Sequence, residues 1–361
     1  MKNSFIISID NSYAMTNNFF SLLLDIPFVR ASEIIVVLDG VNNANVISYC
    51  TSLAQKYNNV KIHKLEKVGY GIANNFAVKE ATGEFLYFIN TDVFVEADCF
   101  DKMQKKLESK NIDCVQPLLI YPQTNLVQCA GTFFGPYYKA HLFEGNKINA
   151  PIVQKEGPRQ ALTSALYAMK KQTFEDFGGF DEFYFNRLES FELSYKLTLG
   201  GKSCWFLPSA RAWHSRGGGR GQYDSDYSQQ DSYFWSRFGG SARSDILDYI
   251  NMQLNSDILA SPYYVIMMSQ IRSWKEIWDE TDLKTSQFVE MPWISPRPFN
   301  LWDIFPYEIL KYRGSLALIV ESITYLLNNK YWFQLRNNPN DIAIDRFANV
   351  VNILEYIEAL P

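Results

Sequence analysis

The alternation of two hydrophobic periods over residues 1 to about 135 most constrains the fold. Short apolar runs (FIISI, EIIVVLD, KIHKLE and EFLYFINTD) alternate with helix-like stretches (TNNFFSLLLDI, NVISYCTSLAQKY and GIANNFAVKEAT). This order predicts βαβ units and a mostly parallel sheet. Ligands of such sheets bind beyond the carboxyl ends of the strands. The polar residues that directly follow the runs are therefore candidate binding residues: Asp10, Asn11, Asp39, Asn90, Thr91 and Asp92.

The pattern changes after about residue 115. CVQPLLIYP, LVQCAGTFF and SCWFLPSARAWH are typical of strands, and LESFELSYKLTLGG is typical of a helix closed by glycines. Beyond Gly240 the chain is rich in helix-like and aromatic stretches. We expect one domain over residues 1–245 and a mainly helical, aromatic-rich extension over residues 246–361.

Charge and composition exclude several classes of protein. The 361-residue chain has a formal net charge of −5, so bulk electrostatics give no support for a nucleic-acid partner. The five cysteines form no CxxC pair, which favours reduced, buried thiols. The apolar window SLALIVESITYLL contains Glu321 and is shorter than the ~20 residues of a spanning helix. We expect a cytoplasmic protein; a peripheral contact at the inner face of a membrane is an alternative for the aromatic segment near residues 292–314.

Two groups of acidic residues suggest chemistry. Asp92 ends an apolar strand, where it forms either a polar turn or a ligand for a divalent cation that bridges two phosphates. Glu189 and Glu192 are three residues apart and share one face of the predicted helix, which is either solvated or supplies a general base. The GxG at Gly69 and Gly71 lacks the third glycine of a dinucleotide fingerprint, and the chain has no P-loop motif.

A resemblance to a known family rests on four segments taken in order: EIIVVLDG; GYGIANNFAVKEATGEFLYFINTD; VQPLLIYPQTNLVQCAGTFFG; and FGGFDEFYFNRLESFELSYKLTLGGKSCWFLPSARAWH. Over about residues 4 to 220 the chain resembles glycosyltransferase family 2, especially its rhamnosyltransferase-like members with an Asn-x-Asp variant of the DxD motif. The resemblance implies an α/β GT-A fold, a mixed sheet flanked by helices. It also implies inverting transfer of a hexosyl or deoxyhexosyl group from a UDP-, dTDP- or GDP-sugar, with Mn2+ or Mg2+ as cofactor.

The same resemblance implies roles for individual residues. Asp39 would meet the nucleobase, while Asp92 and His214 would hold the metal. Glu189 would take the proton from the acceptor, a glycan or a lipid-linked glycan, in surface polysaccharide or glycoconjugate assembly. The nucleotide-sugar pocket would further be lined by Asp10, Asn11, Gly71, Asn75, Asn90, Thr91, Arg216 and Arg220.

Two departures and one loop qualify this expectation. The family's Glu-Asp pair reads Glu189-Ser190 here, so the usual aspartate base is a serine. Either Glu189 replaces it, or the protein is a non-catalytic nucleotide-sugar-binding or scaffold subunit of a glycan-assembly complex. SIDNSY also stands where a Pro-Thr-Tyr-Asn-like stretch is common. In SRGGGRG, after His214, glycines free the backbone and Arg216 and Arg220 can pair with phosphate; a plain connector is the alternative.

Overall fold

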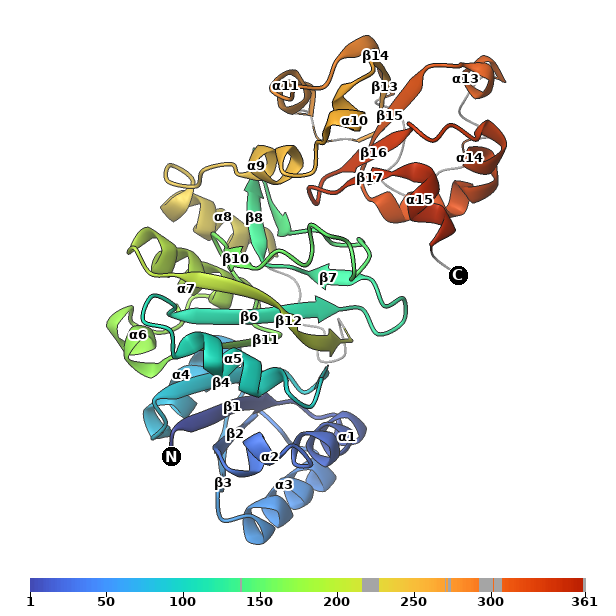
Figure 1. Cartoon of the computed structure of the whole chain (residues 1–361). Coiled ribbons are helices and arrows are strands. Elements are labelled where there is room, and N and C mark those ends of the chain that lie inside the picture. Colours follow the sequence, from blue (N-terminus) through green and yellow to red (C-terminus); the bar gives the residue numbers. More distant parts are fainter. Residues whose placement is uncertain are drawn as a thin grey trace. The chain divides into compact units, whose positions relative to one another are not determined.

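The computed structural model describes residues 1–136, 138–215, 227–269, 271, 274–291, 301 and 307–359. Contacts between residues divide the chain into two compact units, which are described separately (Figure 1). The N-terminal unit comprises Met1–Thr132 and Val153–Ala242. The C-terminal unit comprises Phe133–Ile152 and Arg243–Pro361.

A mixed sheet forms the centre of the N-terminal unit. Its strands lie in the order β10-β12-β6-β11-β4-β1-β2-β3, with β5 added beside β12 and β7 beside β6. The first four strands along the chain are mutually parallel, whereas β11 runs antiparallel to both β4 and β6. The strands are β1 (Asn3–Ile9), β2 (Glu33–Asp39), β3 (Val60–Leu65), β4 (Phe85–Ile89), β5 (Val93–Val95), β6 (Cys114–Ile120), β7 (Val127–Cys129), β10 (Gly157–Pro158), β11 (Leu166–Lys170) and β12 (Cys204–His214).

Helices cover both faces of this sheet. Alternate residues of one strand point to opposite faces, so Phe5 and Ile7 pack in one core with α1, α3 and α5, while Ile6 packs in the other with α4 and α7. All seven residues of β2 are buried, as expected for a central strand covered on both faces. The helices are α1 (Tyr13–Leu23), α2 (Pro27–Arg30), α3 (Ala44–Lys56), α4 (Tyr70–Glu80), α5 (Cys99–Leu107), α6 (Lys171–Asp176), α7 (Glu189–Leu199) and α8 (Tyr227–Phe238). The predicted mixed α/β sheet flanked by helices is confirmed.

The C-terminal unit differs from the mainly helical extension expected from its sequence. It contains a five-stranded sheet in the order β14-β13-β15-β16-β17, parallel except for β17. Its runs YYVIM, SLALIV and IAID are buried strands, but the aromatic segments between them obscure the strand–helix alternation. The strands are β13 (Tyr263–Met267), β14 (Thr285–Glu290), β15 (Ser315–Val320), β16 (Ile342–Asp345) and β17 (Val350–Asn352).

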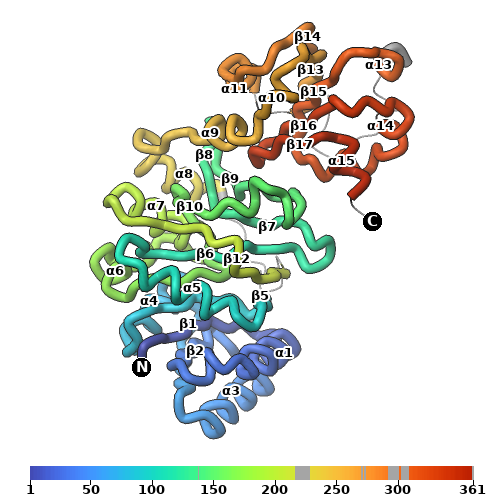
Figure 2. The backbone as a smooth tube through the Cα atoms, in the orientation of Figure 1, coloured from blue at the N-terminus to red at the C-terminus, as the bar shows by residue number. Residues whose placement is uncertain are grey.

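This unit is built from two segments of the chain, whose path Figure 2 traces. Phe133–Ile152 contributes β9 (Tyr138–His141) and most of β8 (Thr132–Gly135), which pair as a two-stranded sheet. The later segment adds the helices α9 (Ile246–Asn251), α10 (Ser256–Leu259), α11 (Trp274–Asp279), α13 (Tyr307–Lys311), η1 (Ile323–Asn329), α14 (Lys330–Arg336) and α15 (Ile353–Glu358). Within the described ranges, no helix has the length and apolarity needed to cross a membrane.

Candidate active site

The predicted site residues lie where strands β1, β2 and β4 of the N-terminal unit end. Asn11 follows β1, and its side-chain oxygen accepts hydrogen bonds from the backbone N–H groups of Asn42 (2.9 Å) and Asn43 (3.0 Å), which follow β2. The Asp10 carboxylate accepts from the N–H of Ser12 at 2.9 Å and so shapes the turn into α1. Both polar residues therefore order the loops at this edge of the sheet.

Asp39, at the end of β2, is buried and holds the segment that leads into α4. One carboxylate oxygen pairs with Nζ of Lys67 at 2.7 Å, and the other accepts from the N–H of Val68 at 2.7 Å. At Gly69 the backbone has φ 87°, and a Cβ would lie 2.4 Å from the carbonyl oxygen of Phe185, so only glycine fits. These contacts fix the start of α4. The contact of Asp39 with a nucleobase stays a prediction.

Asp92 and His214 are brought together by the pairing of β5 with β12. His214 lies opposite Val93 in this antiparallel ladder, which places its side chain next to that of Asp92. Nε2 of His214 lies 3.3 Å from Oδ1 of Asp92, and both side chains are largely buried. The two residues are more than 120 positions apart in the sequence, yet they form one polar pair at the edge of the sheet.

Gln128, on β7, orients the histidine and was not identified from the sequence. Its amide nitrogen donates to the carbonyl oxygen of His214 at 3.0 Å, so its Oε1 faces Nδ1 of the same residue at 2.6 Å. Because an amide oxygen can only accept, Nδ1 carries a proton at this contact, and Nε2 is the ring nitrogen that faces Asp92. The only sequence signal was a polar residue inside the apolar run LVQCAG.

The Asp92–His214 pair fits a divalent cation. A carboxylate oxygen and an imidazole lone pair repel each other unless a proton or a cation lies between them. Ligands about 2.1 Å from a metal lie roughly 3.0–3.4 Å apart at octahedral or tetrahedral angles, which matches the observed 3.3 Å. The described residues contain no cluster of three or more His, Cys, Asp or Glu side chains suited to a metal, so among them this site offers two ligands.

Glu189 begins α7 and is buried, with 3% of its surface exposed. The preceding residue, Leu188, adopts the left-handed conformation (φ 67°), an uncommon backbone for leucine that turns the chain into the helix. Oε1 of Glu189 makes no hydrogen bond with any described residue. Burial raises the pKa of Glu189 to about 7, because the charged form loses its solvation.

Glu192, one turn further along α7, has different partners. Its Oε1 accepts from Nη1 of Arg237, on α8, at 2.9 Å, and the same nitrogen also bonds Asp181. Its other oxygen, Oε2, makes no hydrogen bond with any described residue. Two buried carboxylates at the start of one helix are thus distinguished by their partners: Glu192 is in an ion pair, and Glu189 is not.

Comparisons with known proteins bear on the family and the fold of the chain. Residues 4–155 match the family model described as Glycosyl transferase family 2. An "O-antigen biosynthesis protein RfbC" from Myxococcus xanthus is 32% identical over 123 residues, which is 31% of this chain and about 9% of the length of that protein. Over residues 4–155, less than half of its length, the chain is therefore similar to glycosyltransferase family 2.

Solved structures were also compared with this chain. GalNAc-T7, solved with UDP, GalNAc and Mn2+, matches 79% of this chain and 55% of its own at a TM-score of 0.54 and 17% identity. The mannosyltransferase PcManGT from Pyrobaculum calidifontis, solved with GDP-Man and Mn2+, matches 60% of this chain and 58% of its own at a TM-score of 0.46 and 16% identity. The first likeness supports the GT-A-like α/β fold. The family match does not test the rhamnosyltransferase-like specificity or the Asn-x-Asp motif.

The remaining predicted residues either make local contacts near α4 and β4 or lie outside the described residues. The side-chain amide of Asn75 donates to the carbonyl oxygen of Phe180 at 2.9 Å and accepts from the N–H of Phe180 at 3.0 Å. These two bonds connect α4 to the loop before α7. Gly71 is buried in the first turn of α4, and Thr91 contacts the sulfur of Met15 at 3.4 Å. The backbone N–H of Asn90 bonds the carbonyl oxygen of Ala165 at 3.0 Å. Arg216 and Arg220 lie outside the described residues.

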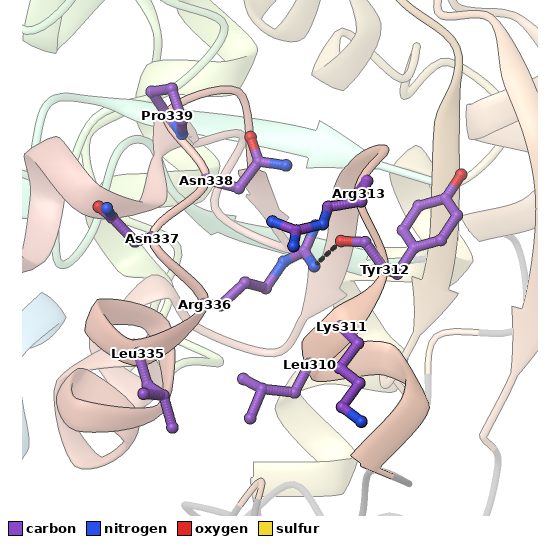
Figure 3. A pocket seen from close by; sticks show the side chains of 9 residues that line it. All are labelled: Leu310, Lys311, Tyr312, Arg313, Leu335, Arg336, Asn337, Asn338 and Pro339. Carbon is purple, nitrogen blue, oxygen red and sulfur yellow. Dashed lines mark hydrogen bonds between the residues drawn. The ribbon is translucent and has the colours of Figure 1, made fainter.

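A cavity of about 480 Å³ lies in the C-terminal unit and contains none of the predicted site residues (Figure 3). Arg336 lies in its wall, and Nε, Nη1 and Nη2 donate to Asp341 and to the carbonyl oxygens of Ile309, Tyr312 and Gly314. All of the donors of this guanidinium are therefore used within the protein. The cavity is lined by Leu310, Lys311, Tyr312, Arg313, Leu335, Arg336, Asn337, Asn338 and Pro339.

Proposed function

We propose that the protein is an inverting, metal-dependent glycosyltransferase that moves a hexosyl or deoxyhexosyl group from a nucleoside-diphosphate sugar to a hydroxyl of a glycan. The observation that carries the proposal is the Asp92–His214 pair, oriented by Gln128 at the strand ends of a family 2 domain. The donor nucleotide is UDP, dTDP or GDP. The acceptor is a glycan or a lipid-linked glycan.

Asp92 and His214 would hold Mn2+ or Mg2+ through a carboxylate oxygen and Nε2. When bound, the cation supplies charge stabilisation for the departing diphosphate. Gln128 keeps the proton on Nδ1, so that Nε2 remains a ligand. Arg216 and Arg220, which follow His214 in the sequence, would pair with phosphate oxygens.

Glu189 would act as the general base. Its carboxylate removes the proton from the acceptor hydroxyl as that oxygen bonds the anomeric carbon and the bond from this carbon to the diphosphate breaks. A base is most effective when its pKa lies near the working pH, and burial brings the pKa of Glu189 to about 7. This supports Glu189 in place of the family aspartate, whose position is Ser190.

The name of the Myxococcus relative supports a role in assembling surface polysaccharide or glycoconjugate. Such a role would place the protein in the cytoplasm, with a peripheral contact at the inner face of the membrane where a lipid-linked acceptor is presented. The second candidate, a non-catalytic nucleotide-sugar-binding subunit of a glycan-assembly complex, is favoured by one observation, the serine at position 190.

A donor panel tests the proposal. UDP-, dTDP- and GDP-sugars are screened by thermal shift with and without Mn2+, and release of nucleoside diphosphate is then measured for each sugar that binds. We expect Mn2+-dependent binding and release for the wild type and loss of both for Asp92→Ala. Binding without release, also in the presence of glycan acceptors, would favour the binding subunit. Unchanged Mn2+-dependent binding by Asp92→Ala would remove Asp92 from the metal site.

A further inference from the structure

An exposed aromatic pair lies beside the candidate base. The rings of Phe183 and Tyr233, on α8, are stacked with their centroids 3.9 Å apart and their planes at 26°. Phe183 also meets Tyr184 in a T-shaped contact, yet it is 44% exposed, so part of its ring remains open to solvent. Most large apolar side chains in the described ranges are buried, and this exposed ring has no role in the core of the protein.

A guanidinium with unused donors accompanies this ring. Nη1 of Arg237 bonds Asp181, Glu192 and the hydroxyl of Tyr233, but Nε and Nη2 make no hydrogen bond with any described residue. The side chain of Arg237 is 34% exposed. Nε and Nη2 form one edge of the planar group, and their two parallel N–H bonds can donate to two adjacent oxygens.

Phe183 lies in the loop that leads into α7 and the candidate base, and Tyr233 stacks on it from α8. A Cβ at Gly71 would lie 3.4 Å from the carbonyl oxygen of Asp181 and 3.5 Å from Cγ of Glu189, so both residues surround the start of α4. The Asp181 carboxylate bonds the N–H of Phe183 at 2.9 Å and the hydroxyl of Tyr233 at 3.2 Å. These bonds fix Phe183 and Tyr233 relative to the segment that carries Glu189.

The charges around this surface select the kind of ligand. Two carboxylates, Asp181 and Glu192, pair with the single guanidinium of Arg237, which leaves an excess of negative charge. This negative charge would repel an anionic sugar, whereas it would not repel a neutral sugar ring. The C–H face of a pyranose is apolar and carries slightly positive hydrogens, which the negative face of an aromatic ring attracts.

We propose that Phe183, Tyr233 and Arg237 form an acceptor subsite that binds a neutral sugar ring, which stacks on Phe183 while two adjacent hydroxyls accept from Nε and Nη2 of Arg237. The inference rests on the proposed function, because it assigns this ring to the acceptor. Phe183 and Arg237 thus select the acceptor, and neither takes part in proton transfer.

Binding of simple glycosides tests the subsite without turnover. Saturation-transfer difference NMR is recorded with the methyl glycosides of glucose, galactose, rhamnose and N-acetylglucosamine, and with methyl glucuronide. Each is measured alone and with Mn2+ plus UDP, GDP or dTDP. We expect saturation of the ring C–H protons of at least one neutral glycoside, and binding roughly tenfold weaker in Phe183→Ala. Arg237→Lys, which keeps the charge but loses the paired donors, should also weaken binding.

Tyr331→Ala is the matched control, because Tyr331 is an exposed aromatic residue (79%) of the C-terminal unit. This variant should bind the glycosides as the wild type does. Absence of saturation for every glycoside, equal binding by Phe183→Ala, or stronger binding of the glucuronide than of the neutral sugars would overturn the proposal. Failure of the proposed function has a separate readout, the absence of nucleotide-sugar binding in the donor panel.

Discussion

At the scale of single residues, the structure separates two carboxylates of similar burial. Glu189 and Glu192 lie on α7 and are 3% and 1% exposed. Oε1 of Glu192 pairs with Arg237, which links α7 to α8, while Oε2 makes no hydrogen bond with a described residue. One oxygen of Glu189 has no partner among the described residues, so its burial is not compensated by an ion pair. Such a buried acid without an ion pair, at the start of a helix, is typical of a functional group.

The pH dependence of turnover should reveal this difference. Because Glu189 must be deprotonated to act as a base, kcat/KM should rise with pH and level off above an apparent pKa of about 7. Glu189→Gln should keep donor binding and lower kcat by about 10²–10⁴. Glu192→Gln should cost much less and keep the same rising limb. An unchanged rate for Glu189→Gln, or a rising limb near pH 4.5, would exclude Glu189 as the base.

Gln128 should act on the metal through His214. Gln128→Leu removes the acceptor that holds the Nδ1 proton, so the ring can adopt the other tautomer or turn away from Asp92. We expect Mn2+ affinity about 10–100-fold lower by calorimetry, with the thermal stability of the protein largely kept. Gln128→Glu, which preserves an acceptor at this point, should restore most of the affinity. Equal affinities for wild type and Gln128→Leu would show that His214 needs no such support.

At the scale of elements, the sequence anticipates the first half of the molecule better than the second. Strands β1, β2 and β4 were recognisable because central strands are continuous apolar runs, and Asp39 and Asp92 because polar residues follow them. Contacts between segments that are distant in the sequence leave no local pattern from which they could be predicted. Gln128 approaches His214 through the pairing of β7 with β6 and of β6 with β12. Arg237 bonds Glu192 from a different helix. In the C-terminal unit, the run SLALIV has the composition of a strand or of a buried helix, and pattern alone did not distinguish them.

Arg336 joins four elements of the C-terminal unit. Its guanidinium bonds the carbonyl oxygen of Tyr312, as Figure 3 shows, and those of Ile309 in α13 and Gly314 before β15. It also pairs with Asp341 just before β16. Arg336→Leu would leave Asp341 buried without its counter-ion, so we expect a loss of about 3–5 kcal/mol. Hydrogen exchange of peptides from β15 and β16 should report this loss. Arg313→Leu, an exposed residue of the same cavity, is the control and should change the exchange little; similar effects of both variants would contradict the role of Arg336.

At the scale of the whole molecule, the two units share one interleaved chain. The polypeptide leaves the N-terminal unit after Thr132, returns at Val153 and leaves again after Ala242. Within the C-terminal unit, the early segment is held by paired backbone and side-chain bonds between Phe134 and Asp245 and by a buried bond from Asn146 to Asn349. The C-terminal unit therefore depends on residues that precede the second half of the N-terminal unit.

A fragment of residues 1–245 should consequently contain an unprotected segment. Phe133, Leu142 and Phe143 are at most 1% exposed in the full chain, and this fragment lacks the rest of the C-terminal unit that covers them. We expect rapid cleavage between residues 133 and 152 in limited proteolysis followed by mass spectrometry, whereas the full chain resists. A fragment as resistant as the full chain in this interval would show that the N-terminal unit alone can protect it.

The interleaved path also limits how such a gene can change by recombination. A crossover near codon 243 would exchange most of the C-terminal unit but keep the old Phe133–Ile152, which must still supply Asn146 to position 349 and a backbone carbonyl to Tyr356. A functional exchange therefore requires two separate coding segments from one parent, inherited together. Substitutions in Phe133–Ile152 and in Arg243–Pro361 are expected to be correlated across related genes. This should hold although the codons for Val153–Ala242, which belong to the N-terminal unit, lie between them.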